Sequence, residues 1–409
     1  MNQKSLGFVR NLFSEYYKRD YMPKKLAYME KREFGFALFE GFMLRHKSFQ
    51  NYDELKKFFV ESTPTDAYCS CAYYENPEAE MDKKGWLGAD LIFDVDADHI
   101  PTGCDKIHDE WTCGNCGFSG KGITPEKCPA CEGEKFNVAT WPCEVCLASA
   151  KAETMKLLEM LMEDFGFSDK ELEVFFSGHR GYHVHIENDA IKTLDSVSRK
   201  EIVDYVTCLG FEMILHDVVE KKRKMSIKDL FSGSLGWSKR INEGMVNFLL
   251  EAEEVDYNKI GIKKNVAKMM IQNKDSLLRS YKNSGVWGSV RGVGFETWRK
   301  IVEHVTKVQS AKIDTVVTTD IHRLIRLSET LNGKTGFKKV DFPVSEIEEF
   351  DPFQRAVALK RGTVSIFVSD APRFRLNNET FGPYKKQKVE LPTAAAVLLV
   401  CKDKAEVVD

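Results

Sequence analysis

Eight consecutive residues of this chain read Leu91-Ile92-Phe93-Asp94-Val95-Asp96-Ala97-Asp98, an apolar run with carboxylates at alternate positions. Because successive side chains of a β-strand point to opposite faces, Asp94 and Asp96 would share one face while Phe93 and Val95 pack on the other. Two adjacent carboxylates near an apolar core repel each other, and hard divalent cations relieve that cost. The run therefore predicts a buried strand with a divalent-metal site, rather than an exposed strand end, and a pair of such ions can serve phosphoryl transfer.

A second polar motif lies at the turn of a predicted hairpin. Residues 175–186 read Phe175-Phe176-Ser177-Gly178-His179-Arg180-Gly181-Tyr182-His183-Val184-His185-Ile186. In the second strand Tyr182, Val184 and Ile186 would share the core face, which places His183 and His185 on the opposite face. Ser177, Arg180 and His183 could then converge on an anionic group, with glycines that let the backbone approach closely. We interpret the turn as a phosphate site rather than a set of core histidines.

A third carboxylate is expected in a segment farther along the chain. It reads Lys312-Ile313-Asp314-Thr315-Val316-Val317-Thr318-Thr319-Asp320-Ile321-His322-Arg323-Leu324-Ile325-Arg326. This pattern predicts a β-branched strand followed by a basic, helix-like turn. Asp314 is the candidate ligand, but Asp320 could do the same work or cap the helix that follows. The spacing does not choose between them.

The cysteines concentrate in one region, with seven of the eleven between Cys104 and Cys146. No secretory signal opens the sequence, and no apolar run reaches the roughly 18 residues that a membrane span needs. We therefore expect a cytoplasmic location with no membrane segment. In that reducing environment metal binding explains clustered cysteines better than disulfides do.

Two Cys-x2-Cys pairs, Cys113/Cys116 and Cys128/Cys131, are separated by eleven residues, close to zinc-ribbon spacing. A third pair, Cys143/Cys146, is left with Cys104 and one further ligand. His108 is the best candidate by distance and type, and His99 and Cys113 are alternatives. Sites closed by four protein ligands have no open position for water, so we expect one or two structural zinc ions.

The remaining pattern predicts an α+β chain. Helical spacing after the third cysteine pair stops at Gly166, strand alternation returns from Leu172, and residues 196–307 have a helical, highly charged pattern. We expect a catalytic domain over 1–195 and 308–409, built as a mixed β-sheet with flanking helices. A zinc-binding insertion would occupy 104–146 within it, and a mainly helical subdomain would occupy 196–307.

The formal net charge is only −3, so recognition of a polyanion would depend on local charge. Arg180, Arg323 and Arg326 are the cations expected to face phosphates. The run Lys221-Lys222-Arg223-Lys224 could contact a duplex backbone, although such runs are more often solvated helix faces.

In their order along the chain, these blocks resemble the small catalytic subunit of the archaeal and eukaryotic type of DNA primase, in its archaeal form. The hallmarks of that family are an acidic pair in a hydrophobic strand, a Ser-Gly-x-Arg-Gly-x-His turn, and a later Asp followed by Leu-Ile-Arg and Thr-Gly. They occur here at Asp94 and Asp96, at 177–183, and at Asp314 with 324–326 and 335–336. Residues 32–36 and 44–49 resemble the family's opening strands, so the resemblance extends from about residue 10 to about residue 340.

The resemblance implies a role for each block. Asp94, Asp96 and Asp314 would be the catalytic, metal-binding acids, in preference to Asp320. The nucleotide-binding residues would be Ser177, His179, Arg180, His183, Arg323, Arg326 and Asn332. Asn332 stands where the family usually has a His, so a neutral amide would replace that contact. The family also has a structural zinc knuckle that Cys104, Cys143 and Cys146 fit, with the ribbon as an insertion inside it.

The implied activity is template-directed synthesis of short primers from nucleoside triphosphates on single-stranded DNA, with two Mg²⁺ or Mn²⁺ ions. The implied partner is the primase large subunit, in a heterodimer. The alternatives are a related primase-polymerase of repair, a two-metal phosphodiesterase, and a non-enzymatic nucleic-acid-binding subunit built on the ribbon. The Ser-Gly-His-Arg-Gly turn favours a polymerase over a nuclease because only the polymerase needs cations for a triphosphate.

Overall fold

The structure is a computed structural model that describes residues 1–210, 235–284, 287 and 290–408. The chain divides into two compact units. The first comprises Met1–Met155, Ser168–Lys200 and Ile313–Asp409, and the second comprises Lys156–Phe167 and Glu201–Lys312. The α+β class predicted from the sequence is confirmed, whereas the predicted domain boundaries stay predictions.

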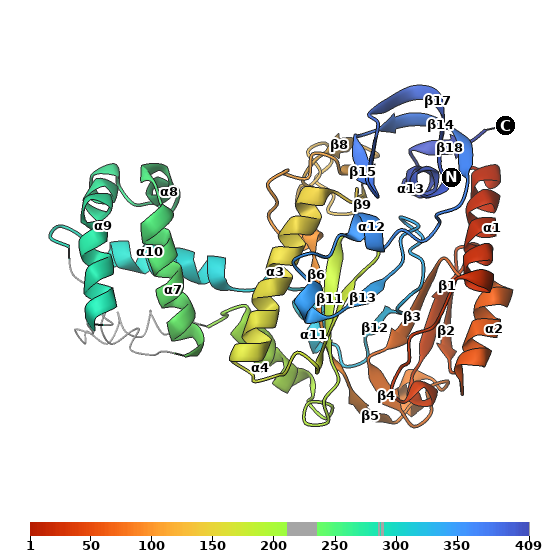
Figure 1. The fold of residues 1–409 in the computed structure, drawn as a ribbon, viewed down its shortest axis with the longest axis horizontal. Helices are drawn as coiled ribbons and strands as arrows, with labels where there is room; N and C mark the ends of the chain where they lie inside the picture. Colours follow the sequence, from red (N-terminus) through yellow and green to blue (C-terminus); the bar gives the residue numbers. More distant parts are fainter. Residues whose placement is uncertain (211–234, 285–286, 288–289, 409) are drawn as a thin grey trace. The chain divides into compact units, whose positions relative to one another are not determined.

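One four-stranded sheet of the first unit carries the acidic pair (Figure 1), in the order β13-β10-β11-β6. Its strands are β6 (Leu91–Asp96), β10 (Leu172–Phe176), β11 (Gly181–Ile186) and β13 (Val340–Phe342). Phe93, Val95 and Tyr182 are fully buried, as the alternation predicts. The predicted hairpin is therefore confirmed as β10 and β11, which pair from Leu172 and Ile186 to Phe176 and Tyr182.

A second four-stranded sheet has the order β12-β3-β1-β2. Its strands are β1 (Phe34–Ala37), β2 (Met43–Lys47), β3 (Asp66–Ser70) and β12 (Leu324–Arg326). The helices α1 (Gln3–Arg19) and α2 (Tyr52–Ser62) pack on it through aromatic rings, with Tyr17 and Phe59 centroids 4.8 Å apart and Phe36 and Phe58 centroids 4.4 Å apart. This aromatic layer fixes the sheet that carries Arg326.

Two sequence-based expectations about these sheets are wrong. The sheet was expected to be mixed, but every strand pairing between described strands is antiparallel. Residues 312–319 were expected to form a strand, but they contain the short helix α11 (Thr315–Thr319). The reason is local, because Oδ1 of Asp314 accepts from Val316 N at 3.0 Å and caps the helix. The basic residues that were expected to form a helix-like turn after this segment include strand β12 (Leu324–Arg326).

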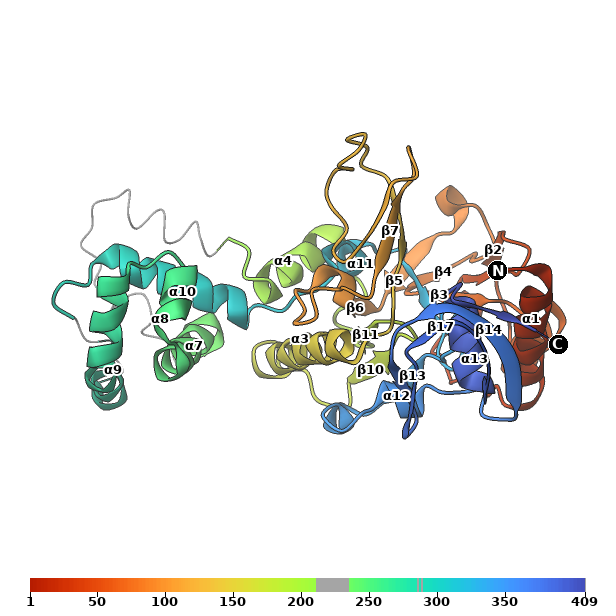
Figure 2. The same cartoon turned by 90° about the horizontal axis from the view of Figure 1, so that it is seen from above.

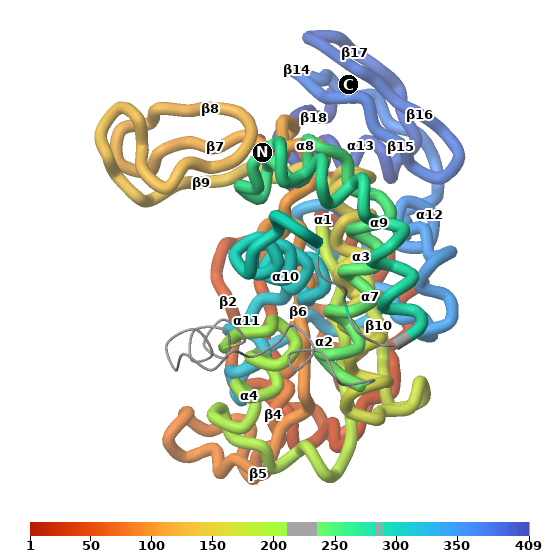
Figure 3. Tube along the Cα trace, turned by 90° about the vertical axis from the view of Figure 1, so that its left-hand side faces the viewer, coloured from red at the N-terminus to blue at the C-terminus, as the bar shows by residue number. Residues whose placement is uncertain are grey.

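The rest of the first unit consists of smaller sheets and helices. A C-terminal sheet joins β14 (Thr363–Ala371), β17 (Tyr384–Pro392) and β18 (Ala405–Val407), and the apolar helix α13 (Thr393–Cys401) packs against it. An excursion carries β7 (Glu110–Cys113), β8 (Ser119–Lys121) and β9 (Phe136–Ala139) and stands out from its unit in Figures 2 and 3. Further elements are α3 (Glu144–Glu163), α4 (Ser196–Val206), α12 (Pro352–Arg355), β4 (Ala72–Tyr74), β5 (Trp86–Ala89), β15 (Phe374–Leu376) and β16 (Glu379–Phe381).

The second unit is helical. Besides the ends of α3 and α4 it contains α7 (Gly236–Glu251), α8 (Glu254–Lys259), α9 (Lys264–Ser284) and α10 (Phe295–Gln309). Its core includes Met245, Tyr257 and Trp298. The basic run at 221–224 lies outside the described residues. In the described part of the chain, no helix combines the length and apolar character that crossing a bilayer requires.

Candidate active site

The register of two strands brings the acidic pair and the phosphate motif together. Strands β6 and β11 pair antiparallel, with Asp94 opposite His183 and Asp96 opposite Gly181. Oδ1 of Asp94 lies 3.5 Å from Nε2 of His183. A Cβ at Gly181 would lie 2.4 Å from the Val95 carbonyl oxygen, so the close approach of the turn to the acidic strand requires glycine there.

The third acid reaches this pair from a different element. The backbone N–H of Asp314 donates to the carbonyl oxygen of Asp94 at 2.8 Å, which holds the start of α11 against β6. Burial raises the pKa of Asp94 to about 7, and the negative charges of Asp96 and Asp314 add to that effect. Asp320 lies at the other end of α11, where its Oδ1 accepts from His322 N at 3.0 Å. The fold thus groups Asp314 with the acidic pair.

The donor set of these acids fits hard divalent cations. The negative charges of Asp96 and Asp314 disfavour ionisation of Asp94, and cations with oxygen ligands relieve that cost. Among the described residues, two clusters bring three or more donor atoms within 4.8 Å of one another, and neither contains these acids. The three acids therefore do not form a closed cage. An open set of carboxylates suits Mg²⁺ or Mn²⁺, because such ions keep waters and share their coordination with substrate phosphates.

The raised pKa of Asp94 predicts a pH-dependent cost to folding. Because its pKa is about 7 in the folded chain against an ordinary 3.8, this carboxyl favours folding when protonated, and that stabilisation is lost as pH rises through 7. Asp94→Asn is therefore expected to raise the free energy of unfolding at pH 8, without added divalent cations, by on the order of 3 kcal/mol. At pH 4 the gain should nearly vanish. Denaturant titrations at both pH values test this, and an equal effect at both would contradict the raised pKa.

The turn between β10 and β11 is held by its serine. Oγ of Ser177 accepts from the backbone N–H groups of His179 at 3.3 Å and Gly181 at 3.2 Å. Because the oxygen already accepts two hydrogen bonds, the role left to this hydroxyl is donation. Gly178 has φ of 80°, and its carbonyl oxygen accepts from Oγ1 of Thr335 at 2.6 Å. The turn is thus tied to the Thr-Gly element that follows Asn332.

Arg180 is fully buried between two carboxylates. Its NH1 donates to Oδ2 of Asp109 at 2.5 Å, and its NH2 pairs with Asp98, whose side chain is 42 % exposed. Burial lowers the pKa of Arg180 to about 10, so the guanidinium stays charged at neutral pH. Its Nε is buried without a hydrogen-bond partner among the described residues. The solvent-exposed partner of Arg180 is therefore Asp98, and its buried partner is Asp109.

The two histidines of β11 share a face, as predicted, with ring planes 11° apart and centroids 6.1 Å apart. That face is not open, however, because His183 is only 6 % exposed and His185 is partly buried. Burial lowers the pKa of both histidines well below the usual range and leaves them neutral. Nδ1 of His183 and Nε2 of His185 have no hydrogen-bond partner within the described structure. The sequence pattern identified the face but not the layer that covers it.

Several of the remaining predicted nucleotide-binding residues already contact protein groups. Arg326 on β12 donates to Oδ1 of Asp66 at 2.6 Å, and the charge of Arg323 lowers the pKa of Asp94. Asn332 is buried, and its Oδ1 accepts from Lys334 N at 2.8 Å. Nε2 of His179 is 3.1 Å from Oγ1 of Thr140 and 3.0 Å from Nζ of Lys402. The His179 side chain thus already has protein partners.

Sequence reasoning missed Lys339, a buried lysine that directly precedes β13. Its side chain is 1 % exposed, and its Nζ donates to the carbonyl oxygen of Arg326 at 2.8 Å and lies over the ring of Phe175. Burial lowers its pKa to about 7, and its charge acts on Asp94, His183 and His185. In the sequence it belongs to the pair Lys338-Lys339 just before a strand, which reads as an ordinary surface feature.

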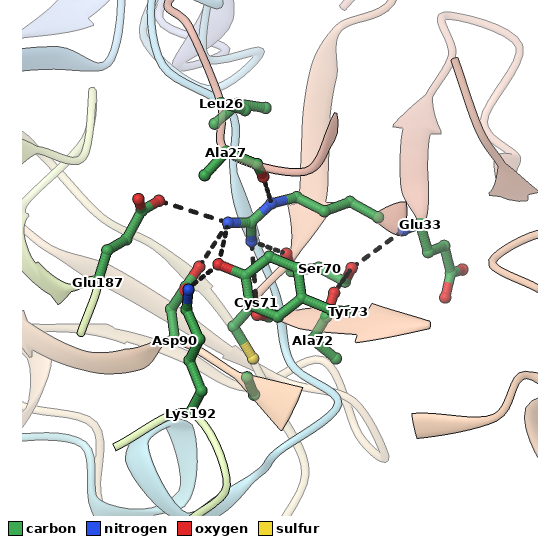
Figure 4. Close-up of polar contacts among 12 residues, drawn as sticks. Leu26, Ala27, Glu33, Ser70, Cys71, Ala72, Tyr73, Asp90, Glu187 and Lys192 are labelled. Atoms are coloured by element: carbon green, nitrogen blue, oxygen red, sulfur yellow. Dashed lines mark hydrogen bonds and ion pairs between the residues drawn. The ribbon is translucent and has the colours of Figure 1, made fainter. Parts of the chain in front are cut away.

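The start of the acidic strand is anchored by Arg32, within the block that resembles an opening strand, and Figure 4 labels its partners Ser70, Asp90 and Glu187. Its guanidinium donates to the carbonyl oxygen of Ser70 at 2.8 Å and pairs with Oδ2 of Asp90 at 2.7 Å. Arg199 donates to the carbonyl oxygens of Ala89 and Asp90 from the other side. Because Asp90 directly precedes β6, these two arginines fix where the acidic pair lies.

The cysteines form two four-residue clusters at the predicted positions. Cys113, Cys116, Cys128 and Cys131 make one, and Cys104, His108, Cys143 and Cys146 make the other. In each, the donor atoms lie within 4.8 Å of one another, so each cluster could hold a metal ion. His108 occupies the fourth position that the sequence left open between His108, His99 and Cys113. Four thiolate and imidazole donors in a compact group are the ligands that structural zinc prefers.

Comparison with known proteins identifies related chains. A family described as DNA primase small subunit matches residues 140–345. The chain is 30 % identical to the DNA primase small subunit PriS of Nitrosopumilus maritimus over 412 residues that cover 100 % of both chains. It is 32 % identical to that of Methanothrix thermoacetophila, also over 100 % of both. With that of Picrophilus torridus it shares 34 % over 382 residues, 91 % of this chain and 90 % of the relative.

Proposed function

Because this chain belongs to the family of DNA primase small subunits, it is the catalytic subunit of a DNA primase, and we propose that Asp94, Asp96 and Asp314 hold the divalent cations of its nucleotidyl transfer. The observation that supports this proposal is the pairing of β6 with β11, which sets Asp94 and Asp96 directly opposite the turn that is predicted to bind phosphate. When bound, two Mg²⁺ or Mn²⁺ ions would activate the primer 3′-hydroxyl and neutralise the triphosphate and the leaving pyrophosphate.

The triphosphate of the incoming nucleotide would occupy the cationic side of the site. Arg180 would offer a forked pair of donors, the Ser177 hydroxyl would donate one hydrogen bond, and neutral His183 would use the Nδ1 that has no partner in the described structure. For Arg180 to engage phosphate, the exposed Asp98 must give up its place, because Asp109 is buried behind the guanidinium. The contribution of these residues is positioning and charge stabilisation.

The other predicted nucleotide contacts are assigned by their place in the site. Arg323 and Arg326 would extend the cationic side toward the triphosphate. Asn332 would contact the nucleotide through its amide in place of the family's His, and His179 would support the turn from behind because its Nε2 already faces Thr140 and Lys402. Lys339 joins this set, since its charge acts on both His183 and Asp94.

We also propose the partners and layout that the family implies. The primase large subunit would form a heterodimer with this chain, and single-stranded DNA would serve as template. The catalytic domain would span 1–195 and 308–409, with the zinc-binding insertion at 104–146 and a helical subdomain at 196–307. The weak net charge of −3 is consistent with template binding that a partner supplies.

Primer synthesis on unprimed single-stranded DNA tests the proposed activity. The purified chain, alone and with the large subunit, would be incubated with nucleoside triphosphates and Mn²⁺ or Mg²⁺. New oligonucleotides should form in wild type and be absent in Asp94→Asn/Asp96→Asn. Degradation of the template by wild type alone, without synthesis, would assign the acids to phosphodiester hydrolysis instead.

The two cysteine clusters predict a zinc content of two ions per chain. Cys128→Ser is expected to lower it to one, and Cys146→Ser is expected to remove the other ion, because each variant opens one four-ligand cluster. Cys69→Ser is the matched control, since Cys69 is a buried thiol outside both clusters. The zinc content of each purified chain is measured by metal analysis. Two zinc ions per chain in all variants would contradict the assignment of one ion to each cluster.

A further inference from the structure

A single carboxylate joins one cysteine cluster to the phosphate-binding arginine. Oδ1 of Asp109 lies 2.7 Å from Nδ1 of His108, and Oδ2 accepts from NH1 of Arg180 at 2.5 Å. The other ring nitrogen of His108, Nε2, faces the cluster, 3.3 Å from Sγ of Cys104 and 3.4 Å from Sγ of Cys146. A continuous chain of contacts therefore runs from the thiols through His108 and Asp109 to Arg180.

The position of Asp109 is tightly constrained. Asp109 is only 2 % exposed, and its Oδ1 also accepts from the backbone N–H of Trp141 at 2.9 Å. Both oxygens are thus engaged at once, one toward the cluster and one toward the arginine. Neighbouring Glu110 points elsewhere and pairs with Lys404 at 2.6 Å and Lys121 at 3.2 Å. The link depends on Asp109 itself and not on a general excess of acid.

We propose that Asp109 is a positioning residue that couples metal binding at the Cys104, His108, Cys143 and Cys146 cluster to triphosphate binding by Arg180. This inference rests on the proposed function, because it takes Arg180 as a triphosphate ligand. A carboxylate on the outer nitrogen of a metal-bound histidine orients the ring and strengthens the ligand. The same carboxylate holds one edge of the rigid Arg180 fork, so the metal and the nucleotide share one support.

Coupling of this kind is reciprocal. If the metal-bound cluster holds Asp109 where Arg180 needs it, metal should raise the affinity for triphosphate, and triphosphate should raise the affinity for metal by the same factor. We expect the tighter metal binding to appear as slower metal release. A purely structural zinc ion, whose only effect is to stabilise its loop, would show no such dependence on nucleotide.

Asp109→Asn tests the link with little change in shape. The amide has one acceptor in place of two carboxylate oxygens, so it cannot serve both His108 and Arg180 as acceptor. We expect zinc to leave the cluster about 10-fold or more faster in the presence of a chromogenic chelator. We also expect the dissociation constant for ATP, measured with Ca²⁺ so that no synthesis occurs, to rise about 10-fold. Glu110→Gln is the matched control and should change neither quantity.

The reciprocal measurement is made first in a chain that keeps Asp109. It uses the full chain with Cys113→Ser/Cys128→Ser, so that the zinc released comes from one cluster. Saturating ATP with Ca²⁺ should slow zinc release several-fold, and this slowing should disappear when Asp109→Asn is added. Because it compares the same folded chain with and without nucleotide, the result does not depend on the stability of the Asp109 variant.

The outcomes separate this inference from the proposed function. Either of two results would overturn the coupling. In the first, Asp109→Asn retains zinc less well but binds ATP with unchanged affinity. In the second, ATP does not change the rate of zinc release from the chain that keeps Asp109. Unchanged ATP affinity in Arg180→Gln would instead overturn the role of Arg180 in triphosphate binding. Two results together would support the coupling. Arg180→Gln would lose ATP affinity but retain zinc, and Asp109→Asn would lose both ATP affinity and zinc retention.

Discussion

Asp96→Asn is expected to lower the rate of primer synthesis by at least about a thousand-fold, which corresponds to about 4 kcal/mol of lost transition-state stabilisation. The carboxylate would ligate the catalytic ions, and an amide neither carries the charge nor replaces it as a ligand. The substitution preserves shape, since the oxygen that accepts from Asp98 N at 2.8 Å is retained. The measurement is the initial rate of synthesis on unprimed single-stranded DNA with saturating Mn²⁺.

The matched control for this loss is Asp320→Asn. Asp320 lies six residues beyond Asp314 in the sequence, and its carboxylate accepts from His322 N instead of facing the acidic pair. Its substitution should leave the rate within a few-fold of wild type, whereas Asp314→Asn should match Asp96→Asn. Zinc content and thermal stability should be similar in all of these chains. A large loss in Asp320→Asn with activity kept in Asp314→Asn would reverse the assignment of the third acid.

Arg180→Gln is expected to raise the KM for nucleoside triphosphates at least about 100-fold, because a forked, charged contact to phosphate is removed from a buried site. It should also lower stability, since Asp109 would remain buried without its cation, and removing one partner of such a pair costs about 3–5 kcal/mol. Steady-state synthesis on a primed template, well below the unfolding temperature, separates the effect on KM from the loss of stability.

Arg375→Gln provides a control for the general effect of removing an arginine held by two carboxylates. Arg375 pairs with Glu144 at 2.6 Å and with Asp351 at 2.8 Å, and it is not one of the residues proposed to bind the nucleotide. It should leave KM unchanged. If Arg180→Gln and Arg375→Gln had the same KM, the proposed role of Arg180 would be wrong.

The parts of this site that follow local patterns could be predicted from the sequence. Alternation in 91–96 and 172–186 gave the strands and the faces of Asp94, Asp96 and His183, because a period of two fixes the side-chain direction. The Cys-x2-Cys spacing predicted the ribbon cluster and the Cys143/Cys146 half of the other cluster, whereas its fourth ligand, His108, was chosen only by the fold. The resemblance to the primase family selects Asp314 over Asp320.

The parts that depend on long-range packing could not be predicted. Residues 313–319 are rich in β-branched side chains and suggest a strand, yet one hydrogen bond from Val316 N to Asp314 starts a helix there. The direction of β6 relative to β11 depends on the long segment between them, so a mixed sheet was as plausible as an antiparallel one. Lys339, Asp98 and Asp109 are ordinary charged residues in the sequence, and their roles follow only from what they face in the fold.

The number of Mn²⁺ ions that the chain binds with a non-hydrolysable nucleoside triphosphate tests most directly whether these acids form the catalytic centre. Free Mn²⁺ would be measured by electron paramagnetic resonance at pH 8, above the raised pKa of Asp94. Wild type is expected to bind two ions, and Asp94→Asn/Asp96→Asn is expected to bind neither with comparable affinity. Equal binding by both chains would show that the acidic strand does not hold the ions and would contradict the proposed site.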